Sequence, residues 1–302
     1  MPFRITDASI NDRLVSNIAQ QRNRISVAQE QISSGKRINR PSDDPVGAAA
    51  VIEIRASQAS LEQFRRNARV VDTALSVSDG ALDSYERMLD KARALITQGS
   101  SDLTREEGRK AIASELDGLR QSIMNVANTQ SEGQYIFGGT EQENAPVDPT
   151  TVTLIVSSAP PRVIQIEPNA PPVIAGVTAN AVFANSDGTI FEMLSAAAAA
   201  LRGTGDPAAD QAALGAALDQ LSDFGDQASV ARTTLGKSLN SVEIARDRLD
   251  RDSLSMEETA QAIESADFAK SSVELLEAER ALEATLQAGG QRGRRSLLDF
   301  LG

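Results

Sequence analysis

The carboxylates between residues 140 and 187 are the side chains of this sequence best suited to acid–base chemistry. Two carboxylates that flank a bond can act as general acid and general base in a hydrolase. Five occur in this stretch: Glu141, Glu143, Asp148, Glu167 and Asp187. Their spacing matches no recognisable catalytic constellation. The 302-residue chain has 0 His and 0 Cys, so the commonest acid–base side chain, thiolate nucleophiles and the commonest metal ligands are missing.

An enzyme is therefore disfavoured, and a carboxylate hydrolase stays as the weakest alternative. We assign no catalytic residue, no cofactor and no metal ligand. Asp43 and Asp44 could coordinate a cation, but they stand directly before Pro45. Because Asp caps free helix N–H groups and proline suits the first turn, we expect a helix start there. Gly138 and Gly139 indicate a turn rather than a ligand loop.

A long hydrophobic seam follows Pro45. Apolar and small residues from Ala50 to Ile96 alternate in steps of four and three, which is the a/d pattern of a coiled coil. The pattern predicts one helix from about Pro45 to Gln98. A second seam from Leu214 to Leu249 predicts another helix, which begins at Asp206-Pro207 and runs to about Asp252.

Two long helices of similar length would pair as an antiparallel coiled-coil-like rod. Between them, Thr104 and Glu107 resemble a capping box that opens a shorter helix, which would fold back to make a three-helix packing. Residues 138–188 are rich in proline, and Val152–Val156 and Val163–Glu167 look like short strands. A second capping box, Thr189 with Glu192, predicts an Ala-rich helix that ends near Gly203.

The fold class that follows is mainly α: a long antiparallel helical rod with paired terminal helices and a small β-rich insertion. We expect paired terminal helices in 1–44 and 253–302, the rod in 45–137 and 189–252, and the insertion in 138–188. Ser255 and Glu258 resemble a capping box at the start of the last helix. Phe137 and Tyr135 are expected to pin the rod to the insertion, because aromatics form only 3% of the chain.

The terminal helices carry thin apolar stripes that are too narrow for stable isolated helices. We expect them to be partly disordered in the monomer and ordered on assembly, so their apolar residues form the candidate assembly interface. These residues are Leu14, Ile18, Ile25, Ile32, Ile263, Phe268, Leu275, Leu282, Leu286, Leu297 and Leu298.

The formal net charge of −12 and the lack of basic runs interleaved with aromatics argue against a nucleic-acid partner. The apolar runs are too short for membrane insertion, and the N-terminus lacks the apolar core of a secretory signal peptide. By itself this composition would place the chain in the cytosol.

The stretch SSGKRINRPSDDPVGAAA (33–50) resembles the flagellin superfamily, in which a similar loop joins the N-terminal helix to the first long helix. Three motifs favour the hook-associated branch over flagellin proper: RPSDDP (40–45), GQYIFGGT (133–140) and the C-terminal SLLDFL (296–301). The resemblance covers both ends of the chain, roughly 200 residues in all.

The resemblance implies a structural adaptor that polymerises as a ring at the junction between flagellar hook and filament. It also implies neighbouring hook-associated and flagellin subunits, and an export chaperone at the C-terminal helix. The implied location is the extracellular bacterial flagellum, reached by type III export without a cleaved signal peptide. Flagellin, the bulk filament subunit, is the alternative. Arg292, Arg294 and Arg295 could bind an anionic surface, but a solvated or chaperone-contacting patch is the simpler interpretation.

Overall fold

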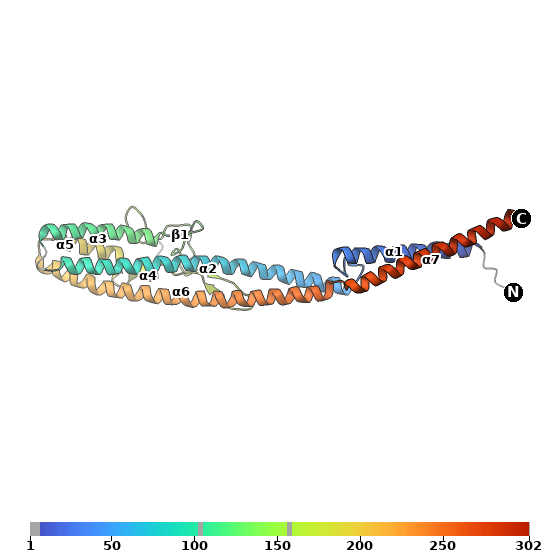
Figure 1. Ribbon diagram of the computed structural model, residues 1–302. Helices are drawn as coiled ribbons and strands as arrows, with labels where there is room; N and C mark the ends of the chain where they lie inside the picture. Colours follow the sequence, from blue (N-terminus) through green and yellow to red (C-terminus); the bar gives the residue numbers. More distant parts are fainter. Residues whose placement is uncertain (1–6, 102–104, 156–158, 302) are drawn as a thin grey trace. The chain divides into compact units, whose positions relative to one another are not determined.

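The structure, a computed structural model, describes residues 7–101, 105–155 and 159–301. In this part of the chain it has seven helices and three two-stranded antiparallel sheets (Figure 1). The helices are α1 (Asp7–Ser34), α2 (Pro45–Gly99), α3 (Glu106–Ala127), α4 (Ala179–Phe183), α5 (Ile190–Arg202), α6 (Pro207–Glu264) and α7 (Phe268–Leu301). The sheets pair β1 (Gln130–Ser131) with β2 (Gln134–Tyr135), β3 (Val163–Ile164) with β4 (Val173–Ile174), and β5 (Ala184–Asn185) with β6 (Gly188–Thr189). The predicted fold class is confirmed.

The chain divides into two compact units. Residues 1–60 and 252–302 form the first, here called the terminal unit, and residues 61–251 form the second, the central unit. The long helices α2 and α6 contribute residues to both units, α1 and α7 belong to the terminal unit, and α3, α4, α5 and the strands belong to the central unit.

The predicted seams of α2 and α6 form the core of the central unit. Leu75, Leu82 and Leu235 lie on these seams and are fully buried. Ion pairs across the seam join Arg65 to Asp250 and Arg246 to Asp72, so residue numbers rise along α2 as they fall along α6. The two helices are therefore antiparallel, as the sequence predicts.

Two shorter helices thicken this core. Lys91 of α2 binds Glu115 of α3 at 2.7 Å, which places α3 on α2 as expected. Arg202 at the end of α5 binds Asp117 of α3, so α5 joins the same packing. This part of the central unit thus contains four helices: the three expected to pack together and the predicted Ala-rich helix α5, which also buries an apolar face.

Aromatic residues close the core next to the insertion. Tyr85 and Phe137 both meet Phe183 of α4 edge-on, with ring centroids 4.9 and 5.3 Å apart, and Phe191 stands 6.1 Å from Phe183. Complete burial raises the pKa of the Tyr85 phenol well above its usual value. Phe137 thus has the pinning role that the sequence predicts. Tyr135 pairs instead with Gln130 in the first hairpin and is half-buried.

Side-chain caps fix several helix starts. The Gly47 amide donates to Asp44 Oδ1 at 2.9 Å, so Asp44 caps α2 as expected. Asp43 Oδ2 accepts the Arg40 amide at 2.8 Å and orders the preceding loop. At α5, Thr189 Oγ1 accepts the Glu192 amide while Glu192 Oε2 accepts the Thr189 amide, which confirms the second predicted capping box.

The end expected for the second long helix is wrong. The helix expected to stop near Asp252 continues as α6 to Glu264, and Ser255 and Glu258 lie inside it. The reason is that the seam continues after Leu249 in steps of four and three. It passes through Ser253, Met256, Ala260 and Ile263.

Helix α3 begins at Glu106 with Arg105 at the N-cap, and the Arg105 side chain makes no capping bond. The capping box of Thr104 with Glu107 stays a prediction, because Thr104 lies outside the described residues. In the insertion, the strand expected at Val163–Glu167 shortens to two residues, and Leu154 makes only an isolated bridge with Val147. Val156 is not described. Nearby prolines lack the N–H that a longer ladder needs.

Candidate assembly surface on the terminal helices

Helices α1 and α7 pack against each other in the terminal unit. The Ser271 hydroxyl of α7 donates to Gln31 Oε1 near the end of α1, at 3.1 Å. A Cβ built on Gly289, farther along α7, would lie 2.8 Å from the side chain of Leu14, near the start of α1. The two helices therefore run antiparallel, with Gln31 beside Ser271 at one end of the contact and Leu14 beside Gly289 at the other.

Small residues set the separation of the pair. Ala28, Ser271 and Ala278 are its most buried side chains, and Gly289 leaves room for Leu14. Small residues let helix backbones approach closely but bury little apolar area. The interface is consequently thin.

The predicted interface residues fall into three groups. The first group is half-buried, because the partner helix covers each of these side chains only partly. It consists of Leu14, Ile18, Ile25, Ile32, Ile263, Leu275 and Leu282. Phe268 and Leu286 are exposed, at 66% and 49%. Leu297 and Leu298 lie in α7, but their side chains fall outside the described part. The same holds for the side chains of Arg292, Arg294 and Arg295.

Further exposed apolar side chains border this stripe. Val15 of α1 is 64% exposed and Leu276 of α7 is 53% exposed. Val27 and Val273 belong to the same group. Sequence reasoning missed Val15 and Val27, because it followed the a/d positions alone. Their position was a usable signal: an apolar residue that lies off the seam of a helix, when the seam already has a partner, is a candidate for contact with another chain.

A polar side chain within the pair lacks a partner. Gln21 takes the place of an apolar residue on the α1 stripe, and its Oε1 is buried without a hydrogen bond among the described residues. A buried acceptor left unsatisfied costs about 1–3 kcal/mol.

The structure also shows where the carboxylates of the insertion lie. Asp148 Oδ1 accepts the Thr150 amide at 2.7 Å, and this hydrogen bond is the main reason that the pKa of Asp148 is below its usual range. Glu167 binds Arg248 of α6 at 3.2 Å. Among Glu141, Glu143, Asp148, Glu167 and Asp187, all within the described residues, no hydrogen bond joins one carboxylate to another. In the part of the chain that is described, no cluster of Asp and Glu could hold a metal ion.

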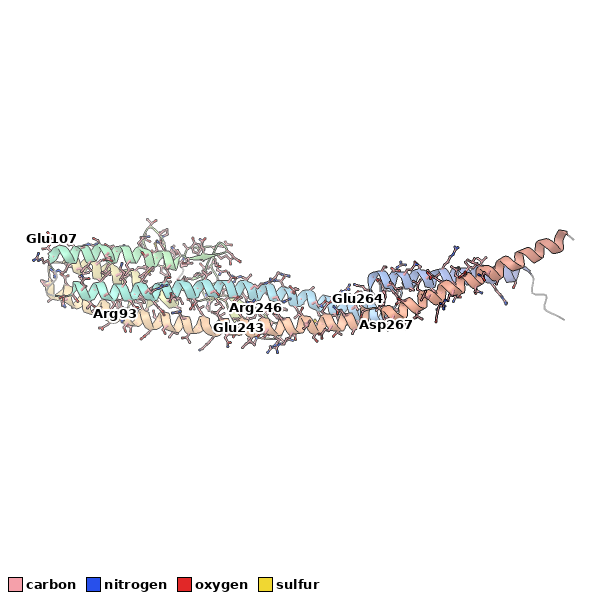
Figure 2. The ribbon with its side chains drawn as sticks, in the orientation of Figure 1. Arg93, Glu107, Glu243, Arg246, Glu264 and Asp267 are labelled. Atoms are coloured by element: carbon pink, nitrogen blue, oxygen red, sulfur yellow. The ribbon has the colours of Figure 1, made fainter. Side chains whose placement is uncertain are left out.

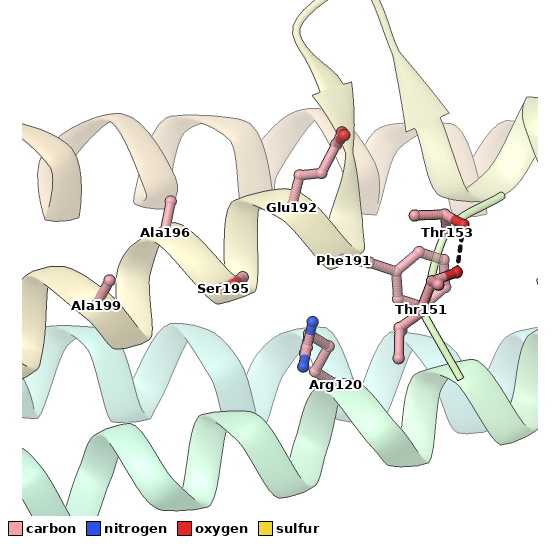
Figure 3. Close-up of a pocket in the computed structure, with 9 residues that line it drawn as sticks. Arg120, Thr151, Thr153, Phe191, Glu192, Ser195, Ala196 and Ala199 are labelled. Carbon is pink, nitrogen blue, oxygen red and sulfur yellow. Dashed lines mark hydrogen bonds between the residues drawn. The ribbon is translucent and has the colours of Figure 1, made fainter. Parts of the chain in front are cut away.

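A hollow of about 380 Å³ opens between α3, α5 and residues 151–153 (Figure 3). Arg120 points toward it, and the Thr151 and Thr153 hydroxyls share a 2.7 Å hydrogen bond at its edge. Glu192 also lines the hollow, but its Oε2 accepts from the backbone and hydroxyl of Thr189. Because this carboxylate belongs to the helix cap, the hollow holds no acid–base pair.

Comparison with known proteins identifies the family. Residues 7–142 match the family described as bacterial flagellin N-terminal helical region. Flagellar hook-associated protein 3 of Escherichia coli strain K12 is 30% identical over 233 residues, which cover 71% of this chain and 73% of that protein. The chain belongs to the hook-associated protein 3 family.

Flagellin relatives match a smaller part. Flagellin B of Helicobacter pylori is 33% identical over 141 residues, which cover 46% of this chain and 27% of the flagellin. Among solved structures, a putative flagellar hook-associated protein from Vibrio parahaemolyticus has the same fold, with a TM-score of 0.68. At 21% identity it covers 74% of this chain and 100% of its own. Within the described residues, no helix is long and apolar enough to cross a membrane.

Proposed function

We propose that this chain is a structural subunit of the bacterial flagellum that polymerises at the junction between hook and filament. Membership of the hook-associated protein 3 family supports this assignment. The single observation that carries the assembly role is the thin α1–α7 pair, which leaves Val15, Phe268 and Leu276 exposed. Apolar side chains exposed on both helices of a thinly packed pair mark a candidate contact surface.

In this proposal the terminal helices of neighbouring copies pack together and build a ring. The expected interface residues, from Leu14 through Leu286 to Leu298, contribute to the contacts within and between copies. Each copy also meets a neighbouring hook-associated protein on one side and flagellin on the other. Small axial shifts between packed copies would let one ring fit both a curved hook and a stiffer filament.

The proposal includes the route to that position. The subunit leaves the cell by flagellar type III export without a cleaved signal peptide and acts outside the cell. Before export, a cytoplasmic chaperone covers the apolar face of α7, including Leu276 and Leu286. No catalytic step belongs to this role.

The experiment replaces apolar residues of the terminal helices by aspartate. Leu276→Asp should block incorporation into flagella and leave the monomer folded, because the Leu276 side chain is already exposed in the monomer. Ile25→Asp and Leu282→Asp should also block incorporation and should loosen the α1–α7 pair as well. Ala284→Asp, on an exposed position of the same helix, is the matched control and should assemble.

Incorporation is measured by immunolabelling of isolated flagella, and monomer folding by circular dichroism. Normal motility and labelling in the Leu276→Asp, Ile25→Asp and Leu282→Asp strains would overturn the proposal. The labelling pattern also separates the junction role from that of flagellin. A few copies at one axial position support the junction, whereas copies along the whole filament support a bulk filament subunit.

A further inference from the structure

Four helix ends meet within the terminal unit. The loop of residues 35–44 leads from α1 to α2, and residues 265–267 lead from α6 to α7. An isolated antiparallel bridge between Lys36 and Ser265 joins the two connections. In this bridge the Arg37 amide donates to the Glu264 carbonyl at 2.7 Å, and the Ala266 amide donates to the Gly35 carbonyl at 3.0 Å.

Glu264 stands at the centre of this meeting point. It is the last residue of α6, and Figure 2 labels it close to Asp267 at the start of α7. Its side chain is only 13% exposed, and the carboxylate binds two cations. Lys36 Nζ comes from the first connection, and Arg55 Nη2, at 2.7 and 2.9 Å from the two carboxylate oxygens, comes from α2. One carboxylate thus ties three separate segments together.

Arg37 forms a second tie at the same place. Its Nη2 donates to the Ile263 carbonyl at 2.9 Å and to Asp44 Oδ2 at 3.1 Å. The first bond satisfies a carbonyl at the C-terminal end of α6, and the second binds the residue that caps α2. Hydrogen bonds with a charged partner are about twice as strong as neutral ones. The connections are consequently held by these polar contacts together with the buried side chain of Ile38.

We propose that these contacts form a releasable joint, in which the Glu264 carboxylate locks the α1–α7 pair onto the ends of α2 and α6. Loss of that negative charge frees the pair to change its direction while α1 and α7 stay helical. Among the described residues of the two connections, Ile38 is the one apolar side chain that is buried, so opening the joint exposes less apolar area than opening the core of the central unit would. The use of such a joint rests on the proposed function, since a subunit between two unlike neighbours benefits from an adjustable pair.

Hydrogen exchange tests the joint on the full-length, unassembled chain. In Glu264→Ala, the amides of Arg37 and Ala266 should exchange about tenfold faster or more, because their bonds form only when the joint is closed. Glu264→Gln should also accelerate exchange of both amides, because it removes the negative charge, but by less than Glu264→Ala, since its amide oxygen still accepts a hydrogen bond. Glu258→Ala is the matched control, because Glu258 is an exposed carboxylate of the same helix. It should change these rates less than about twofold.

A distance measurement complements the exchange rates. The sequence has 0 Cys, so cysteines introduced at the exposed positions Ala19 and Ala59 are the only thiols available for spin labels. The distance distribution between the labels should be narrow in the parent and broader in Glu264→Ala, with unchanged helix content by circular dichroism. Unchanged exchange and an unchanged distribution in Glu264→Ala would overturn the joint, and so would melting of α1 and α7. Since neither measurement involves flagella, failure of the joint is distinguishable from failure of the assembly role.

Discussion

The terminal and central units share the same heptad spacing but bury their seam residues to different extents. In the central unit, seam residues such as Leu75 and Leu235 are fully buried, because α3, α5 and the insertion cover α2 and α6. In the terminal unit, the corresponding Ile25 and Leu282 are half-buried, because among the described residues α1 and α7 pack chiefly on each other. The difference shows that heptad spacing predicts helix pairing but does not set how completely a seam is buried. Partners outside the seam decide that.

Truncation of one leucine in each unit should give the largest contrast. Leu75→Ala removes a fully buried side chain and should lower the free energy of unfolding of the central unit by about 2–5 kcal/mol. Leu282→Ala should cost about 1 kcal/mol, because its side chain already meets solvent. Chemical denaturation followed by circular dichroism measures both. Equal losses would show that the two seams are equally well packed, contrary to the comparison.

In limited proteolysis, the thinly packed terminal unit should be cleaved before the central unit. Cleavage inside a helix requires local unfolding, which is cheaper where fewer apolar contacts must break. Trypsin should therefore cut at Arg24 and Arg280 before Arg69 and Arg93, although all four side chains are exposed. Mass spectrometry of the early fragments identifies the sites. A resistant terminal unit with early cuts at Arg69 and Arg93 would contradict the prediction.

As the pH falls, the terminal unit should lose stability before the central unit. This loss should be smaller than the effects predicted above. Lys36 and Arg55 hold the pKa of Glu264 below its usual range, and the Gly47 amide and Arg37 do the same for Asp44. Glu257 has a lowered pKa too, chiefly from its hydrogen bond with Gln58. A carboxyl whose pKa is lower in the folded state stabilises that state above its unfolded pKa. This stabilisation is fully present above the unfolded pKa, about 4 for Asp and Glu, and is lost as the pH falls through the lower folded pKa.

Hydrogen exchange of Arg37 and Ala266 as a function of pH, corrected for the intrinsic rate, measures this effect. Amides of the α2–α6 seam in the central unit should stay protected over the same range, because its contacts are mainly apolar. The lowered pKa values of that unit belong to Glu106 and Asp148, whose partners lie in their own turns. Simultaneous loss of protection in both units would contradict the prediction.

Much of the fold was predictable because its signals are local. The Asp44 cap, the Thr189–Glu192 box and the spacing from Ala50 to Ile96 each depend on neighbours in sequence. The box expected at Ser255 was misleading for the same reason. A local motif cannot show that the seam continues through Met256 and Ala260.

Other features depend on residues far apart in the chain. The contact of Tyr85 with Phe183 requires α4 to cross α2, and the cations that bind Glu264 come from a loop and a helix more than two hundred residues earlier in the sequence. The exposure of Phe268 carries no signal in the sequence, and that of Val15 is indicated only by its position off the α1 seam. Whether an apolar side chain is covered depends on the whole packing and not on its own position.

The close approach of Gly289 to Leu14 has a consequence for how the terminal pair can move. If α7 slid by about one turn along α1, Thr285 or Leu286 would take the place of Gly289, and its Cβ would meet Leu14. The observed alignment of the two helices is therefore favoured over a slide in this direction, whereas a slide in the opposite direction would bring Gly293 to Leu14 without a Cβ. An axial adjustment between copies in the first direction must then carry α1 and α7 together.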